Sequence, residues 1–175
     1  MPFTVGGDEE GSRSIPLWAE PSVGPVLRIV PADPDHLEEW RAIHNAIIPT
    51  APLGTDDVKE RATRNRLTLG YDGDVLVGNA TVRPPDEEGT AVVIVRILPE
   101  HRRRGHGSSY LTHELAEAES QRPAHIGTVV LASNEDGLAF ALARGFAEVD
   151  RYLLPGDTVP FVDLRLGEAQ RPRRN

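Results

Sequence analysis

The stretch from Ala91 to Leu111 places the strongest constraint on how this chain can fold. It passes from the near-continuous apolar run AVVIVRIL (91–98) through HRRRGHG (101–107) into SSYL, where a helical pattern begins. The apolar run predicts a strand that is buried on both faces and therefore lies centrally in its sheet. A strand that turns through glycines into a helix points unpaired backbone N–H groups and the positive helix end at one place, which favours an anion.

The residue types at this junction favour a phosphate, and a diphosphate over a carboxylate. Gly105 and Gly107 let the backbone approach the anion with no Cβ in the way, and the arginines before them add attraction. Two other phosphate motifs fail on specific residues. A Walker loop lacks its lysine here, and a dinucleotide fingerprint needs a small residue where the chain has Tyr110.

Hydrophobic periodicity predicts the element order βααβββαβαββ along the chain. Strands are expected at 26–30, on either side of the Asp72-Gly73 turn, and at 91–98, 128–133, 147–154 and 161–166; helices are expected at 33–48, at 54–65, from the junction to just before Pro123, and at 134–146. Asp33 and Thr55 are expected to cap the first two helices, and Gly145 to end the last one in the left-handed conformation. A parallel crossover should join strands 91–98 and 128–133, which are too far apart for a hairpin.

This pattern predicts an α/β (α+β) fold, a mixed central sheet of about seven strands flanked by about four helices on both faces. A chain of 175 residues suits one domain with a single core. The domain is expected at 25–167, with a flexible N-terminal arm at 1–24 and a disordered tail at 168–175.

Composition narrows the classes of function. The chain has no cysteine, which excludes a thiol nucleophile and any Cys-based metal site, and its net charge of −8 argues against nucleic-acid or anionic-membrane binding. The first residues lack the basic and apolar segments of a secretory signal, and the longest apolar run is too short for a bilayer. We therefore expect a cytoplasmic protein with small-molecule partners, no nucleic-acid or membrane partner, and no metal.

The run Arg102-Arg103-Arg104-Gly105-His106-Gly107 matches the pyrophosphate-loop signature of the GNAT superfamily of N-acetyltransferases: Arg or Gln, two residues, Gly, one residue, Gly or Ala. The chain also resembles this family in its element order and in the spacing of Asn134, Phe140, Gly145 and Phe146. The resemblance runs from about Val26 to Leu166, and the connection NAIIPTAPLGTDDVKE is similar to that of actinobacterial members. It implies a GNAT fold and acetyl-CoA as cosubstrate.

The resemblance also implies which residues hold acetyl-CoA. Backbone groups near Ile97 and Leu98 would bind the pantetheine arm in a gap beside the following parallel strand, and N–H groups of residues 103–108 would bind the diphosphate. Asn134 would bond the pantetheine arm, although a plain helix cap is an equal alternative for it. The expected cofactor-binding residues are Ile97, Leu98, Arg102, Arg103, Arg104, Gly105, His106, Gly107, Ser108, Asn134 and Phe140.

The catalytic residues stay unknown at this stage. Many family members carry a tyrosine seven residues after the asparagine to protonate the leaving thiolate, and this chain has Ala141 there. Tyr110 or Tyr152 could substitute only if the fold brings either one to the sulfur. The candidate bases are Asp86, Glu87, Glu88, His44 and His101, none of which the sequence singles out.

The leading hypothesis is an acyltransferase that moves an acetyl or short acyl group from acetyl-CoA to a primary amine of a small molecule or peptide. A noncatalytic acyl-CoA-binding protein is the alternative, because of Ala141, and a protein-interaction module is the third possibility. Acidic residues of the second helix, Asp56, Asp57 and Glu60, could attract a cationic amine. A homodimer is also possible, since some similar proteins carry two such domains in tandem.

Overall fold

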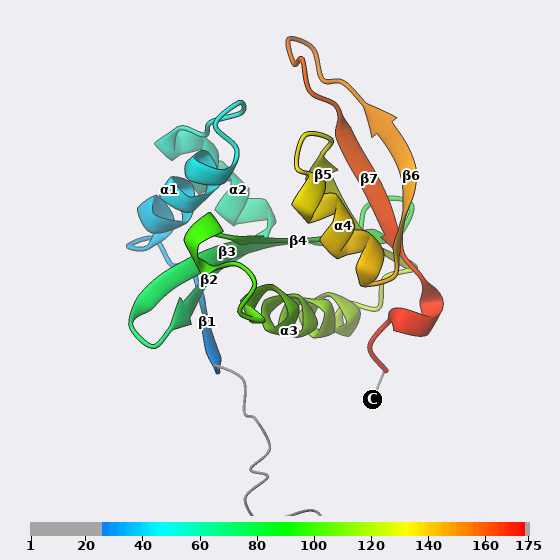
Figure 1. Ribbon diagram of the computed structural model, residues 1–175, viewed down its shortest axis with the longest axis horizontal. Helices are drawn as coiled ribbons and strands as arrows, with labels where there is room; N and C mark the ends of the chain where they lie inside the picture. Colours follow the sequence, from blue (N-terminus) through cyan, green and yellow to red (C-terminus); the bar gives the residue numbers. More distant parts are fainter. Residues whose placement is uncertain (1–25, 174–175) are drawn as a thin grey trace, which may run out of the picture.

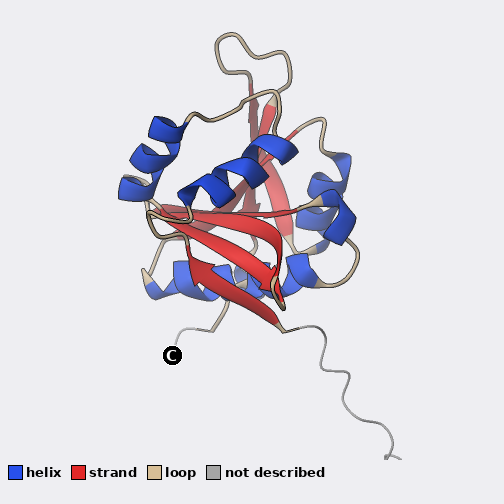
Figure 2. Ribbon diagram, turned by 90° about the vertical axis from the view of Figure 1, so that its left-hand side faces the viewer, coloured by secondary structure: helices blue, strands red, loops and turns tan. Residues whose placement is uncertain are grey.

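The computed structural model describes residues 26–173, which form one seven-stranded mixed sheet with four α-helices packed on its two faces (Figures 1 and 2). The strand order is β1-β2-β3-β4-β5-β7-β6. The strands are β1 (Leu27–Pro31), β2 (Arg66–Asp72), β3 (Val75–Arg83), β4 (Thr90–Ile97), β5 (His125–Leu131), β6 (Phe146–Tyr152) and β7 (Phe161–Leu166). The helices are α1 (Leu37–Ile47), α2 (Thr55–Arg64), α3 (His106–Ser120) and α4 (Glu135–Ala143), with short 3-10 turns η1 (Pro99–His101) and η2 (Glu168–Gln170).

The predicted fold class and element order are confirmed, and most boundaries lie within three residues of the expected ones. The strand predicted at 128–133 begins earlier, at His125, because its first residues pair with β4 and its last ones with β7. The predicted N-terminal arm, 1–24, lies outside the described residues.

The helices α1 and α2 cover one face of the sheet, above β2, β3 and β4 (Figure 1). Their apolar sides pack on β2 in a buried cluster that contains Trp40, Ile43, Val58, Leu67 and Leu69. Both helices begin differently from the prediction. The first begins at Leu37, because the Asp33 carboxylate accepts a hydrogen bond from the backbone N–H of Asp35 (3.1 Å) and closes a turn before the helix. The second has Gly54 as its N-cap, with Thr55 as its first helical residue.

The strands β1 to β4 are antiparallel neighbours, and the β2–β3 hairpin turns at Asp72-Gly73 as the sequence predicts. Gly73 has a φ of +60°, the left-handed conformation that such a turn requires. The residues of β3 alternate between the faces of the sheet: Ala80 and Val82 face the α3 side, whereas Asn79 faces α1 and donates to the Trp40 carbonyl at 2.9 Å. The α1 face of β3 is therefore partly polar.

The strands β4 and β5 are parallel, as predicted for a crossover connection, but they pair over only three positions. The pairs are Thr90 with His125, Ala91 with Ile126, and Val92 with Gly127. Beyond Val92 the two strands separate, and β5 continues along β7 instead. Figure 1 shows β4 crossing the view while β5, β7 and β6 run upward, so the sheet opens at this point.

The opposite face of the sheet is covered by α3 and α4, whose apolar residues share one buried cluster with β4, β5 and β7. The α4 helix ends at Gly145, whose φ of +89° is the left-handed conformation expected there. Of the tail expected to be disordered, 168–175, the structure describes residues 168–173. Residues 168–170 form η2, and the Arg171 guanidinium pairs with the Glu119 carboxylate of α3 at 3.0 Å, both side chains being at least nine-tenths buried.

Candidate functional site

The turn from η1 into α3 has the backbone conformation of an anion-binding loop. Arg103 and Gly105 have positive φ angles, +63° and +85°, and the intervening Arg104 is exposed. The first hydrogen bond of the helix runs from Ser109 N to Gly105 O (3.1 Å), so the N–H groups before Ser109 have no partner within the helix. Alternating backbone conformations of this kind turn successive N–H groups toward one concavity, which suits an anion.

The two glycines of the loop differ in their surroundings. A Cβ built on Gly105 would meet no atom within 4 Å, so the space beside this residue is open to a ligand. A Cβ built on Gly107 would lie 3.5 Å from Phe140 Cε2 and 3.7 Å from Ile97 Cγ1, which are ordinary contact distances. The structure thus brings Ile97, Gly107 and Phe140 together, and Gly107 serves the packing of α3 between β4 and α4.

Backbone groups of β4 line the opening in the sheet. The amide of Leu98 donates to the Val77 carbonyl at 2.9 Å, so this N–H is already used within the sheet. In an antiparallel pair the direction of the backbone groups alternates, so Val93, Val95 and Ile97 direct theirs away from β3 and toward the opening. Of the two strand positions expected to bind the cofactor, Ile97 faces the opening and Leu98 faces β3.

The side chains at the start of α3 point in different directions. His106 is only 1% exposed, and its Nε2 lies 3.4 Å from the Asp72 carboxylate, so only its backbone belongs to the loop. The hydroxyl of Ser108 accepts a hydrogen bond from Arg144, and the Arg144 guanidinium stacks 4.6 Å from the centroid of the Phe140 ring. Sequence reasoning missed Arg144, because its nearness to the loop depends on how α4 packs on α3.

Asn134 caps α4, since its Oδ1 accepts from Gly137 N at 2.9 Å. The helix-cap alternative for this residue is therefore present in the structure. Ala141, one turn from the end of α4, is 4% exposed and belongs to the core cluster on the α3 side of the sheet. A methyl group there cannot donate a proton.

The two tyrosines considered as proton donors lie in different places. Tyr110 is fully buried beneath β2, where its hydroxyl is 2.9 Å from Thr68 Oγ1, and burial raises the pKa of Tyr110. This tyrosine is part of the core. Tyr152 on β6 donates to Asp163 Oδ1 at 3.2 Å, and burial, followed by the nearby Asp163 carboxylate, raises the pKa of Tyr152.

Two of the candidate bases, Asp86 and His44, lie in different parts of the structure and have other partners. The Asp86 carboxylate accepts from the backbone N–H groups of Glu88 (3.0 Å) and Thr90 (2.9 Å), so it holds the turn before β4. His44 is 4% exposed, stacks on Trp40, and has its pKa lowered to about 4 by burial and then by the Arg96 charge. This histidine is neutral at pH 7.

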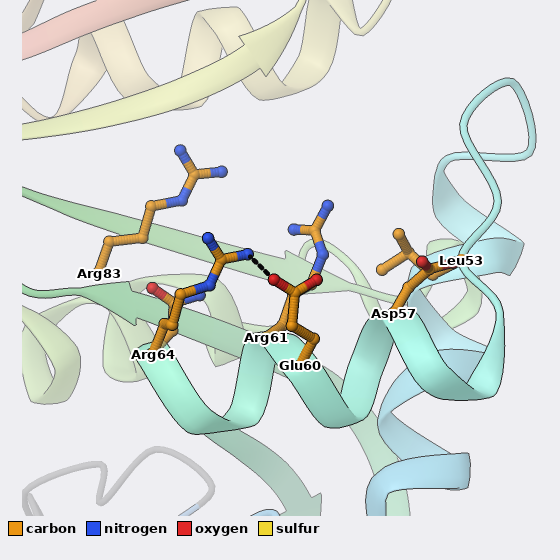
Figure 3. Close-up of a pocket in the computed structure, with 7 residues that line it drawn as sticks. Leu53, Asp57, Glu60, Arg61, Arg64 and Arg83 are labelled. Carbon is orange, nitrogen blue, oxygen red and sulfur yellow. Dashed lines mark ion pairs between the residues drawn. The ribbon is translucent and has the colours of Figure 1, made fainter.

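A cavity of about 400 Å³ lies on the α2 side of the sheet (Figure 3). It is lined by Leu53, Asp57, Glu60, Arg61, Arg64, Asn65 and Arg83. Figure 3 shows the guanidinium groups of the three arginines directed to the same side of α2. Both acids are engaged: Asp57 accepts from Gly54 N at 2.7 Å, and Glu60 pairs with Arg64 at 3.0 Å.

The cavity adjoins the opening between β4 and β5. Arg83 is the strand partner of Val92, and Val92 is the last residue of β4 that pairs with β5. Burial raises the pKa of both Tyr152 and Asp163. The positive charge of Arg83 lowers both pKa values by a smaller amount, so Arg83 lies near enough to act on these two residues. A molecule in this cavity can therefore approach a ligand held along β4.

No group of three or more His, Asp or Glu side chains within residues 26–173 is arranged to hold a metal ion. In the same part of the chain, no helix has the length and apolar character needed to cross a membrane.

Comparisons with known proteins agree with this geometry. The family model described as the acetyltransferase (GNAT) family matches residues 33–146. A search of the curated proteins gave no significant match.

Solved structures show the same fold at low identity. A protein inferred to be a phosphinothricin N-acetyltransferase is 21% identical, with a TM-score of 0.68, over 81% of this chain and 99% of that protein. Naa50 of Arabidopsis thaliana, in complex with the bisubstrate analogue CoA-Ac-MVNAL, is 20% identical, with a TM-score of 0.66, over 81% and 98%. The spermidine N-acetyltransferase of Vibrio cholerae, in complex with CoA and spermine, is 15% identical, with a TM-score of 0.67, over 82% and 96%.

Proposed function

The chain belongs to the acetyltransferase (GNAT) family, and on this premise we propose that it transfers the acetyl group of acetyl-CoA to a primary amine of a small molecule or peptide. The proposal rests on one observation: a loop with the conformation of an anion site lies at the end of the strand that borders the opening in the sheet. The loop of Arg103 and Gly105 presents N–H groups at the start of α3, and the opening between β4 and β5, which begins after Val92, lies along the part of β4 that leads into this loop. A long ligand with a diphosphate and an extended arm suits both.

Three sets of groups in this chain would bind different parts of acetyl-CoA. The N–H groups of residues 103–108 would hold the diphosphate, with Arg103 and Arg104 exposed beside it. The backbone groups of Val95 and the N–H group of Ile97, which face the opening, would pair with the amides of the pantetheine arm. The Ile97 carbonyl already accepts from Arg102 Nε. Ile97 and Phe140 would border the arm on its apolar sides.

The transfer needs a neutral amine, a donor to the carbonyl oxygen and a proton for the departing sulfur. Acetyl-CoA supplies a thioester, whose carbon–sulfur bond breaks as the amine nitrogen bonds to the carbonyl carbon. A β4 N–H facing the opening can donate to the oxygen that gains charge. The α4 position of Ala141 cannot protonate the sulfur, but a thiol with a pKa near 8.5 leaves with little assistance.

A noncatalytic acyl-CoA-binding protein is the second candidate, and the buried Ala141 is the observation that favours it. Calorimetry with acetyl-CoA tests the binding that both candidates share. Release of free CoA is then measured with a panel of amines that includes a peptide N-terminus, spermidine and phosphinothricin. Turnover of any amine supports the transferase. Tight acetyl-CoA binding with no CoA release across the panel would support the binder instead, and no binding would contradict both.

We also infer a cytoplasmic location, where acetyl-CoA is available, and a homodimer. We infer the homodimer because residues 45–60 would correspond to a stretch of actinobacterial members, some of which carry two such domains in tandem. Sedimentation analysis tests the dimer directly, and a monomer at micromolar concentration would contradict it.

A further inference from the structure

The cavity beside α2 carries an unusual excess of positive charge. Arg61 and Arg83 both line it, and neither forms an ion pair with a carboxylate among residues 26–173. Arg64, the third arginine of the lining, is already paired with Glu60. The free positive charge of the cavity therefore comes from two guanidinium groups on different elements, one on α2 and one at the end of β3.

A third guanidinium lies below these two. Arg96 projects from β4 on the same face of the sheet, with its guanidinium 5.9 Å from the centroid of the Trp40 ring, and its Nη1 is buried with no hydrogen-bond partner. Burial, and then the charges of Arg61 and Arg83, lower the pKa of Arg96 to about 9, so it remains charged at pH 7. Burial and the charge of Arg83 lower the pKa of Arg61 in turn.

Clustered like charges cost free energy unless a counter-charge joins them. The chain supplies only part of it: Asp57 and Glu60 line the cavity and attract Arg61, but Asp57 accepts from Gly54 and Glu60 pairs with Arg64. No carboxylate of residues 26–173 forms an ion pair with Arg61 or Arg83. The buried Thr81 hydroxyl, on the same face of β3 as Arg83, also lacks a partner. A planar oxyanion in the cavity would satisfy the guanidinium groups of Arg61 and Arg83, since guanidinium groups bind carboxylates in two-point contacts.

We propose that Arg61 and Arg83 bind a carboxylate of the acceptor, with Arg96 adding its charge from beneath, so that the acceptor is an amine that carries an anionic group, such as an amino acid. This inference rests on the proposed acetyl transfer, which it narrows to a substrate class. Because Arg83 lies one strand from the point where β4 and β5 separate, an anion held there leaves the amine of the same molecule facing the opening. The inference replaces the expectation that Asp56, Asp57 and Glu60 attract a cationic amine.

The first experiment compares acceptors that differ only in the anionic group. Amino acids and their amides are assayed for CoA release with saturating acetyl-CoA. We expect kcat/KM to be at least about tenfold higher for the free acids. Amidation lowers the pKa of the amine and so increases its reactive fraction, which means that a preference for the acids cannot come from amine ionisation. Equal or faster turnover of the amides, or of spermidine, would overturn the carboxylate subsite and leave acetyl transfer standing.

Single variants then test whether the preference for acids depends on Arg61 and Arg83. Arg61→Gln and Arg83→Gln are expected to raise the KM for the acids by about tenfold or more, and to leave the KM for acetyl-CoA unchanged. Arg64→Gln is the matched control, because this arginine lines the same cavity but is already paired with Glu60. An equal effect of all three variants would contradict a specific role for Arg61 and Arg83.

A second measurement does not depend on turnover. Sulfate is added to the protein with CoA present at saturation, so that the phosphate loop is filled, and sodium chloride of equal ionic strength is the reference. We expect sulfate to raise the Tm of the natural protein and of Arg64→Gln, and to have little effect on the double variant R61Q/R83Q. The same sulfate shift in the double variant would overturn the proposal even if no acceptor were found.

Discussion

The Nε atom of Arg102 donates a hydrogen bond of 2.9 Å to the carbonyl oxygen of Ile97. This bond joins the first residue of the loop 102–107 to the last residue of β4, across the 3-10 turn η1. The arginine that begins the loop signature therefore acts on the protein itself, and fixes the angle at which the strand delivers the loop to α3.

Arg102→Gln is expected to weaken acetyl-CoA binding by about tenfold, because a loop that must be ordered on binding costs part of the interaction energy. Arg103→Gln and Arg104→Gln serve as matched controls, since both side chains are exposed and would contribute only screened attraction to the diphosphate. Calorimetry at two salt concentrations separates the cases. The loss of acetyl-CoA affinity in Arg102→Gln should persist at high salt, whereas the losses in the two control variants should become smaller. The same salt dependence in all three variants would mean that Arg102 acts only through its charge.

Gly105→Val is expected to abolish measurable acetyl-CoA binding while the protein still folds. Gly105 has a φ of +85° and open space where a Cβ would lie, so the Cβ of a valine meets no protein atom and occupies the space proposed for the diphosphate. The left-handed backbone should cost about 1–2 kcal/mol of stability.

Gly156→Val is the control for that backbone cost. Gly156 has a φ of +90°, also with no atom within 4 Å of a Cβ, but it lies in the β6–β7 connection, away from the loop. Both variants should lose similar stability in denaturant titrations, and only Gly105→Val should lose the ligand. Normal acetyl-CoA affinity in Gly105→Val would show that the diphosphate is not held at this turn.

Much of the architecture could be predicted because its signals are local. The continuous apolar run at 91–98 predicts a central strand, and the glycines after it predict a turn into a helix; the structure has β4, η1 and α3 there, since both signals follow from neighbouring residues alone. Gly145 likewise marks the end of α4 in the left-handed conformation that only glycine adopts readily.

The cavity beside α2, with Arg96 buried near it, could not be predicted, because Arg61, Arg83 and Arg96 come from three elements that only tertiary packing brings together. The pattern at 91–98 predicts a strand from its apolar residues, and nothing in it indicates where the Arg96 side chain lies. Side-chain competition explains why α1 starts later than predicted: Asp33 bonds to the turn before the helix rather than to its first N–H groups. The polar composition of the tail likewise gives no sign of the contact between Arg171 and a buried carboxylate on another helix.

Arg171→Met is expected to destabilise the protein by about 2–4 kcal/mol, because the Glu119 carboxylate stays buried after it loses this partner. The Arg171 side chain also donates to the carbonyl oxygens of Pro123 and Ala124, each at 2.9 Å, so the variant removes the contacts that hold the tail. Arg151→Met is the control: Arg151 pairs with Glu148 at 3.0 Å on the surface, where solvent screens the pair and its loss should leave stability nearly unchanged. Equal losses for the two variants in urea unfolding would indicate that the tail is not docked.

The buried His44 should make stability depend on pH in a particular window. Its pKa is lowered from 6.5 to about 4 in the folded protein, mainly by burial, while an unfolded chain has the ordinary value. Between these values the unfolded chain binds more protons than the folded one, so stability is complete above about pH 6.5 and falls as the pH drops toward 4. The loss reaches about 3 kcal/mol.

His44→Gln isolates this contribution from the carboxylates that titrate in the same range. Glutamine can still donate to the Ala51 carbonyl, which His44 Nε2 contacts at 3.2 Å, but it carries no titrating group. Between about pH 7.5 and about pH 4.5, on either side of the ordinary histidine pKa, the stability of the natural protein in urea unfolding should fall further than that of the variant. Parallel curves for the two proteins would show that His44 is protonated in the folded state, and that the charges of Arg96 and Arg61 beside it are screened more than the buried geometry implies.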